Sequence, residues 1–502
     1  MRLHFIEQPD WPPLAWLASC ESSSQTVAVH HGSWVEVSER WFCEAVWAGD
    51  YSRGDFDKTD LVAGSGGRLR DDRLIFVSSG STIDRLNSVS VPGRTWVSNS
   101  LPCLLAAAKA TLNPCYRWYY RDSLSIMEGL HRYKRRLSTS LGHVELTYFD
   151  NLRWDGTRLL AEPKPTPRRD FSTFEKYRSF LTTSIAEVAA NGEAPARRHR
   201  WRLLGTLSSG YDSTAISALA RPHGLTEVVT FDRTRSGDDD SGKAVADVLD
   251  LKAHSVSRET WRTAQSPEIP FIASYSAAGD IIFKGAEAHL VGRVLLTGYH
   301  GDKVWDKHTK DLTDQIVRGD SSGLALTEYR LWVGFLNCPV AFWGVRQIRE
   351  INAISNSSEM KPWDVSGDYS RPICRRIAEE AGVPRAAFGT RKRFITVDPF
   401  GGWDTLNSGL DLLTPASQQD YLAWLRKNRA AWLRRGKVPP IASPRLNRWI
   451  NALYRRWINL VSPLAGKRFV WRFIRGRLYH PRYLGWYLFP WSIERAKERY
   501  RR

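Results

Sequence analysis

Sulphur-containing residues are scarce in this sequence, which has six cysteines and three methionines among 502 residues. The cysteines lie far apart, and they form no Cys-x-x-Cys pair and no His/Cys cluster with zinc-ligand spacing. This pattern argues against a structural zinc site and against a disulfide framework. It favours buried, reduced thiols in a cytoplasmic protein.

Long apolar runs are also missing. The longest, LWVGFLNCPVAFWGV at residues 331–345, lies between Arg330 and Arg346 and is shorter than the roughly 20 residues that a spanning helix needs. The segment MRLHFIEQPDWPP at residues 1–13 has acids and prolines where a secretory signal has an apolar core. We therefore expect a cytoplasmic protein that is not exported.

Acidic residues are nearly absent from one part of the chain. Residues 426–502 contain 21 Lys and Arg but only two acids, whereas bases and acids balance in residues 1–425. The net charge of +19 thus belongs to a basic extension of a neutral body. We expect this extension to begin at residue 426.

Hydrophobic periodicity divides the neutral body in two. Residues 1–165 contain short alternating runs such as QTVAVHHGSWVEV, separated by Gly, Ser and Asp, which predict a β-rich α+β domain. The proline-rich segment 162–170 is the predicted linker. In residues 171–425, short apolar strands alternate with helical patterns, which predicts an α/β domain with a parallel sheet covered by helices.

The stretch RLLGTLSSGYDSTAISALA at residues 202–220 places small residues and one acid between a predicted strand and a predicted helix. Gly210 allows a ligand to approach the backbone, and the free N–H groups of a helix beginning at Ser213 or Thr214 favour an anion. Asp212 would repel a bare phosphate, but it suits a phosphate that carries Mg²⁺, an ion that prefers hard oxygen ligands. The turn therefore predicts a magnesium–pyrophosphate site.

Three segments resemble one family of nucleotide-binding enzymes. SSGYDS at residues 208–213 resembles the S-G-G-x-D-S pyrophosphate loop of the N-type ATP pyrophosphatases, or PP-loop enzymes. VVTFD at residues 228–232 is similar to their second strand, whose end lies against adenine. VLLTGYHGDKVWD at residues 294–306 resembles the V-L-S-G-E-G-x-D-E loop of the asparagine synthetases, which makes Asp302 the second magnesium carboxylate.

Further similarity lies on both sides of these segments. Residues 94–107 and 126–149 resemble parts of the glutaminase domain of the asparagine synthetases. Residues 371–394 resemble the family's last block, a helix followed by a loop whose cations, here Arg391 and Lys392, face the phosphates. The chain is thus identified as a member of the asparagine synthetase-type family, which includes the β-lactam synthetases and the lasso-peptide cyclases.

The resemblance implies a fold for each part of the chain. It implies a doubly wound parallel sheet of the adenine nucleotide α-hydrolase type in residues 171–425 and an Ntn-hydrolase-like domain in residues 1–165. The basic extension is expected to be helical. Glutaminases of this family use a cysteine exposed by removal of Met, whereas this chain has Arg2 there and its first cysteine at Cys20. The N-terminal domain is therefore expected to be a degenerate glutaminase, as in the β-lactam synthetases and lasso-peptide cyclases.

The resemblance also assigns the site. Asp212 and Asp302 are expected to hold Mg²⁺ on the pyrophosphate, and Lys392 or Arg391 is expected to neutralise developing charge. The residues expected to bind ATP and pyrophosphate are Leu207, Ser208, Ser209, Gly210, Tyr211, Ser213, Thr230, Phe231, Thr297 and Gly298.

Tyr299 occupies the position of the family's catalytic glutamate. A phenol with a pKa of about 10 is a poor general base near neutral pH. Three explanations are open. Another group accepts the proton that the family's glutamate would take, or the nucleophile needs less help from a base, or the catalytic site is degraded. The neighbouring His300 is a candidate for the base, and a packed or solvated structural histidine is the other interpretation.

The expected activity is that of an ATP-dependent amide-forming ligase. A carboxylate of a small molecule or peptide is adenylated with release of pyrophosphate, and an amine then displaces AMP. The amine comes from a donor substrate or from a separate source of ammonia, and the cofactors are ATP and Mg²⁺. Two alternatives remain open, namely an RNA-modifying PP-loop enzyme and a catalytically degraded nucleotide-binding protein.

The basic extension interleaves arginines with aromatic residues. In RLNRWINALYRRWINL at residues 445–460, the apolar residues recur at helical spacing, with arginines away from that stripe. Three interpretations are open. The helix packs on the body, or it lies on an anionic membrane surface at the inner face of the membrane, or it binds single-stranded nucleic acid, which the pattern favours less.

Overall fold

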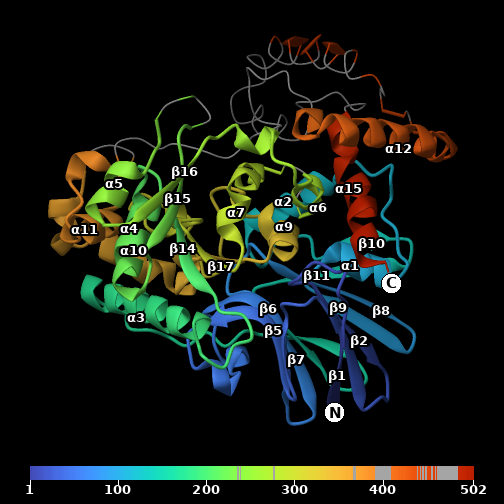
Figure 1. Ribbon diagram of the computed structural model, residues 1–502, viewed down its shortest axis with the longest axis horizontal. Helices are drawn as coiled ribbons and strands as arrows, with labels where there is room; N and C mark the ends of the chain where they lie inside the picture. Colours follow the sequence, from blue (N-terminus) through green and yellow to red (C-terminus); the bar gives the residue numbers. More distant parts are fainter. Residues whose placement is uncertain are drawn as a thin grey trace.

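The computed structural model describes residues 1–234, 237, 239–274, 278–365, 369–389, 409–437, 439–440 and 484–501, together with single positions between 443 and 460. The protein is a mixed α/β structure with three sheets, as Figure 1 shows. The first 165 residues form two sheets, and residues 202–339 form the third. The β-rich start and the parallel sheet that the sequence predicts are both present.

The N-terminal part contains two facing sheets. The strands of sheet A are β1 (Arg2–Glu7), β2 (Trp16–Glu21), β3 (Thr26–His31), β8 (Arg85–Val91), β9 (Arg94–Ser98), β10 (Arg136–Thr139) and β11 (Gly142–Tyr148). Those of sheet B are β4 (Glu36–Ser38), β5 (Trp41–Trp47), β6 (Val62–Arg70), β7 (Arg73–Val77), β12 (Asn151–Trp154) and β13 (Leu159–Glu162). Sheet A has the order β1-β3-β2-β9-β8-β11-β10, and sheet B has the order β13-β12-β7-β6-β5-β4. Neighbouring strands are antiparallel except for β1 and β3.

Large aromatic side chains fill the space between sheets A and B. Trp16 of β2 stacks on Phe76 of β7, with ring centroids 6.0 Å apart, and lies edge-on to Phe42 of β5. Its Nε1 donates to Ser65 Oγ at 3.0 Å, which satisfies the one polar atom of this fully buried ring. The two sheets therefore share a dry core.

The predicted linker is attached to both parts that it joins. Arg169 forms an ion pair with Asp60 of the N-terminal part, and its carbonyl accepts a hydrogen bond from Gln347 Nε2 at 2.8 Å. Helix α3 (Phe174–Gly192) follows, and the Thr173 side chain caps it by accepting the N–H of Lys176. One face of this helix is apolar and buried, and it consists of Phe174, Tyr177, Leu181, Ile185 and Val188.

Sheet C is parallel throughout. Its strands are β14 (Arg202–Thr206), β15 (Glu227–Phe231), β16 (Lys252–Val256), β17 (Arg293–Thr297) and β18 (Leu336–Pro339). They lie in the order β16-β15-β14-β17-β18. The chain therefore moves outward from β14 in one direction and then from β17 in the other. In sheets of this kind, ligands bind outside the carboxyl ends of the two strands where the order reverses.

The remaining helices of the body lie around sheet C or pack on the N-terminal sheets in Figure 1. They are α1 (Leu101–Ala107) and α2 (Tyr119–Leu124) of the N-terminal part, then α4 (Tyr211–Ala220), α5 (Lys243–Val248), α6 (Ile269–Ser274), α7 (Glu287–Leu290), α8 (Gly301–Val304), α9 (Leu326–Val333), α10 (Ile348–Ser355) and α11 (Pro372–Glu380). The C-terminal helices are α12 (Pro415–Arg434) and α15 (Leu488–Ala496). Sheet C, its helices and parts of the N-terminal domain share one continuous apolar core.

Helix α12 runs through residue 426, so the basic extension begins inside a helix rather than between two elements. A change in charge does not end a helix, and the apolar positions Trp424, Leu425 and Trp432 remain buried across the boundary. The chain also returns to the body at α15, where Trp491 Nε1 donates to Asp420 of α12 at 2.8 Å. Part of the basic extension thus belongs to the core.

A buried carboxylate connects three distant segments. Glu328 of α9 accepts hydrogen bonds from Ser100 Oγ, from Trp332 Nε1 and from the hydroxyl of Tyr500. Tyr500 belongs to a 3₁₀ turn (Lys497–Tyr500) directly after α15. These three hydrogen bonds connect the start of α1, helix α9 and the C-terminal turn. Burial raises the pKa of Glu328.

A second buried cluster joins the N-terminal sheets to the rest of the molecule. Arg330 of α9 donates from both terminal nitrogens to Glu44 of β5, at 2.6 and 3.1 Å, and its Nε lies 3.0 Å from Asp84. All three side chains are at most 4 % exposed. Ser65 and Asn99 also donate to Glu44. The charges are therefore paired inside the protein rather than solvated.

Among the described residues, no helix combines the length and the apolarity that crossing a bilayer requires. All six cysteines are buried and none forms a disulfide.

Candidate functional site

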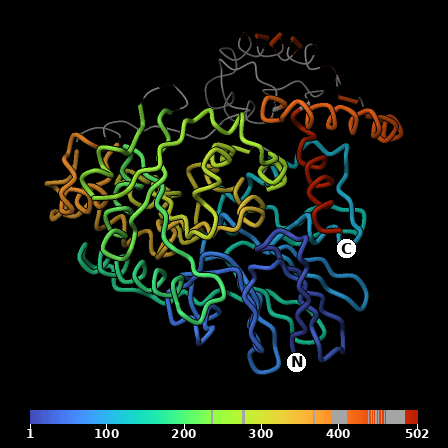
Figure 2. The backbone as a smooth tube through the Cα atoms, viewed as in Figure 1, coloured from blue at the N-terminus to red at the C-terminus, as the bar shows by residue number. Residues whose placement is uncertain are grey.

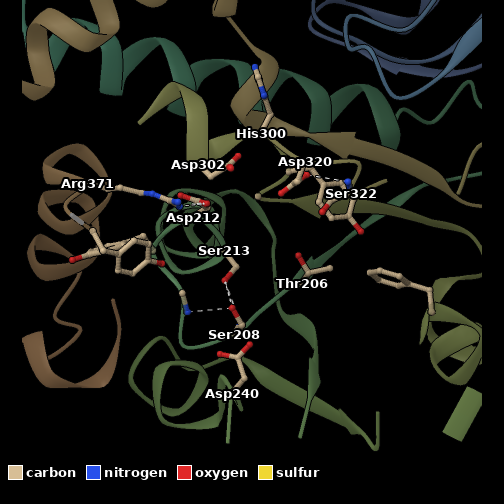
Figure 3. A pocket seen from close by; sticks show the side chains of 16 residues that line it. Thr206, Ser208, Asp212, Ser213, Asp240, His300, Asp302, Asp320, Ser322 and Arg371 are labelled. Atoms are coloured by element: carbon tan, nitrogen blue, oxygen red, sulfur yellow. Dashed lines mark hydrogen bonds and ion pairs between the residues drawn. The ribbon is translucent and has the colours of Figure 1, made fainter. Parts of the chain in front are cut away.

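A cavity of about 170 Å³ lies at the carboxyl ends of β14 and β17, where the strand order of sheet C reverses. Figure 3 shows its lining, which comes from the loops after both strands, from the segment before α9 and from the segment before α11. The lining residues are Thr206, Ser208, Gly210, Tyr211, Asp212, Ser213, Asp240, Phe283, Gly298, Tyr299, His300, Asp302, Asp320, Ser322, Tyr369 and Arg371.

The loop after β14 is held in shape by its own serines. Ser213 Oγ accepts the N–H of Ser208 at 3.1 Å and lies 3.1 Å from Ser208 Oγ, which in turn accepts the N–H of Gly210. Ser209 Oγ donates to Asp240 at 2.7 Å. Helix α4 begins at Tyr211, two residues before the predicted start at Ser213. Its first N–H groups therefore face the cavity together with the loop.

Asp212 lies in the first turn of α4 and is paired with a cation that the sequence prediction did not assign. Arg371, which precedes α11, donates from Nη1 to Asp212 Oδ2, and Cys374 Sγ lies 3.8 Å from Oδ1. Burial raises the pKa of Asp212, the Arg371 guanidinium opposes this rise, and the Asp302 carboxylate adds to it. Both aspartates line the same cavity, and a like charge nearby disfavours the ionised form of each.

The loop after β17 lies directly against Asp212. A Cβ at Gly298 would lie 2.7 Å from Asp212 Cβ, and a Cβ at Gly301 would lie 2.5 Å from Asp212 Cγ. Only glycine allows this approach. It brings Asp302, in the first turn of α8, to the same side of the cavity as Asp212, and Figure 3 shows the two carboxylates side by side.

Gly298→Ala is expected to displace Asp212, because the new methyl group would also lie 3.1 Å from the Ser213 nitrogen. A misplaced catalytic group commonly costs about a hundredfold in rate. If Asp212 is the magnesium ligand that the sequence predicts, the affinity for Mg–ATP should fall as well, which titration calorimetry measures. Unchanged affinity with an intact circular dichroism spectrum would contradict the assignment of Asp212 to the ligand.

Tyr299 lies beneath the segment that precedes α9. A Cβ at Gly323 would lie 2.9 Å from the Tyr299 ring, and the carboxylate of Asp280 accepts the N–H groups of Gly323 and Ala325. Burial and the nearby carboxylates of Asp280 and Asp320 raise the pKa of Tyr299 well above 10. The phenol therefore stays protonated at neutral pH and cannot act as a base.

His300 has a structural environment. Its ring is 2 % exposed, stacks on Phe342 with centroids 4.5 Å apart, and points away from the two aspartates in Figure 3. Its backbone is in the left-handed region, with φ of 76°. Burial lowers the pKa of His300 to about 3, so that the ring is neutral and weakly basic at pH 7. Of the two interpretations of this residue, the geometry favours the packed one.

Acidification is expected to destabilise the protein through His300. Between pH 6.5 and about 3, the unfolded chain binds a proton at this ring that the folded chain excludes, so stability falls as pH falls. The loss from this group between pH 7.5 and pH 5 is about 2 kcal/mol. His300→Asn, which tolerates the left-handed backbone, should remove that part of the pH dependence in urea unfolding, whereas His143→Asn at an exposed position should not.

The structure brings most of the predicted site residues to the cavity. The predicted residues that line it are Ser208, Gly210, Tyr211, Asp212, Ser213, Gly298, Tyr299 and Asp302. Leu207 is buried behind the loop, Ser209 binds Asp240, and Thr297 is buried at the end of β17. Thr230 Oγ1 accepts the N–H of Gly242, and Phe231 packs on Phe283. Arg391 and Lys392 lie outside the described residues.

Several lining residues were not predicted from the sequence. Arg371 and Tyr369 come from a segment about 160 positions after the serine loop, and Asp320 and Ser322 come from the loop before α9. The resemblance covered Arg371, but only the two cations further along were assigned from it. No local pattern marks Asp320, because its proximity to the cavity depends on the path of a long loop.

The donor set fits a magnesium ion that also binds phosphate oxygens. Among the described residues, no three His, Cys, Asp or Glu side chains gather closely enough to hold a metal by themselves. Magnesium in nucleotide sites commonly uses only one or two carboxylates, with phosphate and water oxygens as the other ligands. Asp212 and Asp302 supply two such carboxylates beside the serine loop.

No protein-family model and no curated protein matches this chain. The interpretation of the cavity therefore rests on its geometry and on the sequence motifs.

Proposed function

We propose that the cavity binds Mg–ATP and that the protein is an ATP-dependent, AMP-forming ligase of the asparagine synthetase type. The observation that carries the proposal is the meeting of two acid-bearing loops at the point where the strand order of a parallel sheet reverses. Asp212 and Asp302 are 90 positions apart in the chain and line the same cavity. In this proposal sheet C is the PP-loop sheet, and sheets A and B are the glutaminase-like domain.

The serine loop and the start of α4 would hold the pyrophosphate part of ATP. The N–H groups of α4 and the hydroxyls of Ser208 and Ser213 provide donors, and the loop is already fixed by its internal hydrogen bonds. Asp212 and Asp302 would hold Mg²⁺, which offsets the negative charge of the leaving pyrophosphate when bound. Arg371 keeps a positive charge next to the same oxygens.

The proposed reaction has two steps. A carboxylate oxygen of the substrate attacks the α-phosphorus of ATP, pyrophosphate leaves, and an acyl-adenylate forms. An amine then attacks the acyl carbon, AMP leaves, and the amine gives up a proton. Tyr299 can donate a hydrogen bond but cannot take this proton, whereas Asp320 also lines the cavity and is a carboxylate.

The amine is proposed to come from outside the N-terminal domain. Cys20 of β2 is buried, and burial raises the pKa of its thiol above the ordinary value. A buried thiol of this kind is not a nucleophile. We therefore propose ammonia from solution, a partner subunit or an amine substrate as the nitrogen donor.

The direct test is to incubate the full-length protein with Mg–ATP and a panel of carboxylic acids with hydroxylamine as the amine. We expect AMP and pyrophosphate in equal amounts, measured by chromatography and by a pyrophosphate assay. ADP and phosphate as products would contradict the proposal.

A catalytically degraded nucleotide-binding protein is the second candidate. Two observations favour it: Arg371 already pairs with Asp212, and a tyrosine stands at the catalytic glutamate position. In the same experiment this candidate predicts Mg–ATP binding by calorimetry without AMP formation.

A further inference from the structure

Exposed large apolar side chains are concentrated in one segment of the described chain. They are Val37, Leu141, Val248 and Val291 in the body, each well separated from the others, and Leu433, Leu446, Trp449, Leu453, Trp457 and Leu460 in the C-terminal region. Trp449 is 62 % exposed and Trp457 is 60 % exposed. No other tryptophan among the described residues is exposed to this degree, although most of the 22 in the chain are described.

The exposed residues from Leu446 to Leu460, which we call the apolar stripe, follow helical spacing. The described positions in this stretch are helical, and the stripe recurs at intervals of three or four residues. Such intervals place side chains on one face of a helix. All five residues of the stripe are between 44 % and 76 % exposed, which favours the interpretations in which this face binds something other than the body: Leu446, Trp449, Leu453, Trp457 and Leu460.

The stripe lies at the edge of the molecule. Figure 2 shows the described positions between 446 and 460 beyond α12, on the side away from sheets A and B. The helices before and after this region are fixed to each other, since Trp424 Nε1 donates to Glu494 at 2.8 Å and Arg495 forms an ion pair with Asp420. The exposed residues thus lie in the chain between two helices that are fixed to each other.

The charges near the stripe are of one sign. The stretch from 445 to 460 contains four arginines and no acid, and the described Arg456 is exposed. Tryptophan and leucine on one side of a helix, with arginine elsewhere, suit the boundary between lipid headgroups and acyl chains. Single-stranded nucleic acid is a poorer fit, because three of the five stripe residues are leucines, which do not stack on bases as aromatic rings do.

We propose that the apolar stripe docks the protein on the surface of an anionic lipid bilayer. Trp449, Trp457 and the stripe leucines enter the headgroup boundary, and the exposed Arg456 contacts lipid phosphates. This proposal does not depend on the proposed function.

The test is sedimentation of the full-length protein with vesicles of phosphatidylcholine alone and of phosphatidylcholine mixed with phosphatidylglycerol. We expect binding to the anionic vesicles that decreases with salt. The double variant Trp449→Ser/Trp457→Ser should weaken it by about tenfold or more. The matched control is Leu141→Ser/Val291→Ser, which removes two side chains of the body that are 45 % and 46 % exposed and should leave binding unchanged.

A second measurement needs no variant. Lipids brominated near the headgroup should quench part of the tryptophan fluorescence of the wild-type protein when it binds anionic vesicles. The proposal is overturned if the protein does not bind these vesicles, if it binds without quenching, or if the tryptophan variant binds as well as the control. Retention by single-stranded RNA in preference to the vesicles would assign the stripe to nucleic acid instead.

Discussion

Replacing Asp212 by asparagine is expected to lower the rate of AMP formation about a thousandfold, which corresponds to about 4 kcal/mol of transition-state stabilisation. Asparagine keeps the shape of the side chain but removes the negative charge that would hold Mg²⁺. It also leaves the guanidinium of Arg371, which is 3 % exposed, without its partner carboxylate in the cavity. The measurement is the initial rate of pyrophosphate release with saturating Mg–ATP and substrate.

Asp302→Asn should have a similar effect, and the double variant should be little worse than either single variant, because residues that serve one metal act as a unit. Asp311→Asn is the matched control. Asp311 belongs to the same chain segment but is 52 % exposed and pairs with Lys303 at the surface. Full activity in either site variant, or an equal loss in the control, would contradict the proposed role of the two aspartates.

The second large effect is expected from Arg330→Met. This change keeps the apolar part of the side chain but leaves Glu44 and Asp84 buried near each other without a cation. Removing one partner of a buried ion pair typically costs about 3–5 kcal/mol. The free energy of unfolding, obtained from urea titration, should fall by that amount, and the N-terminal sheets and sheet C should lose their common transition.

Two variants make this result specific. Arg136→Ala breaks a surface pair with Glu145, whose side chains are 69 % and 44 % exposed, and should cost about 0–1 kcal/mol. Adding Glu44→Gln to Arg330→Met should recover part of the loss, because it removes one of the two unpaired charges. No recovery, with a loss as small as that of the surface variant, would show that the cluster does not join the two parts.

The sequence predicts the strands and loops of the site well because the information there is local. The apolar runs of β14 and β17 end in Thr206 and Thr297, and in each case the acid follows within six residues. A parallel sheet places such strand ends at one edge, so that the meeting of Asp212 and Asp302 follows from topology alone. Helix α4 begins at Tyr211, two or three residues before the expected start at Ser213 or Thr214, and Gly210 is the residue that precedes its first turn.

Contacts between distant segments could not be predicted in the same way. Arg371 reaches Asp212 across 159 positions, and Asp320 reaches the cavity through a loop without a repeating pattern. The expected start of the basic extension at residue 426 was placed from charge. The end of a helix depends instead on which side chains pack against the core, and Trp432 is buried. The charged residues lie on the solvent-exposed face of α12, whereas burial of its apolar face decides how far the helix continues.

The hydrogen bonds of Glu328 have a consequence for folding during translation. The partners Ser100 and Tyr500 are separated by almost the whole chain, and α15 lies between α1, α6 and α12. During synthesis, α1 emerges from the ribosome about 390 residues before the turn that covers it, and α9 emerges about 165 residues before that turn. The surface around Glu328 must therefore stay uncovered during the last third of translation, and ribosomes that stop after α12 would release a protein with this surface exposed to chaperones and proteases.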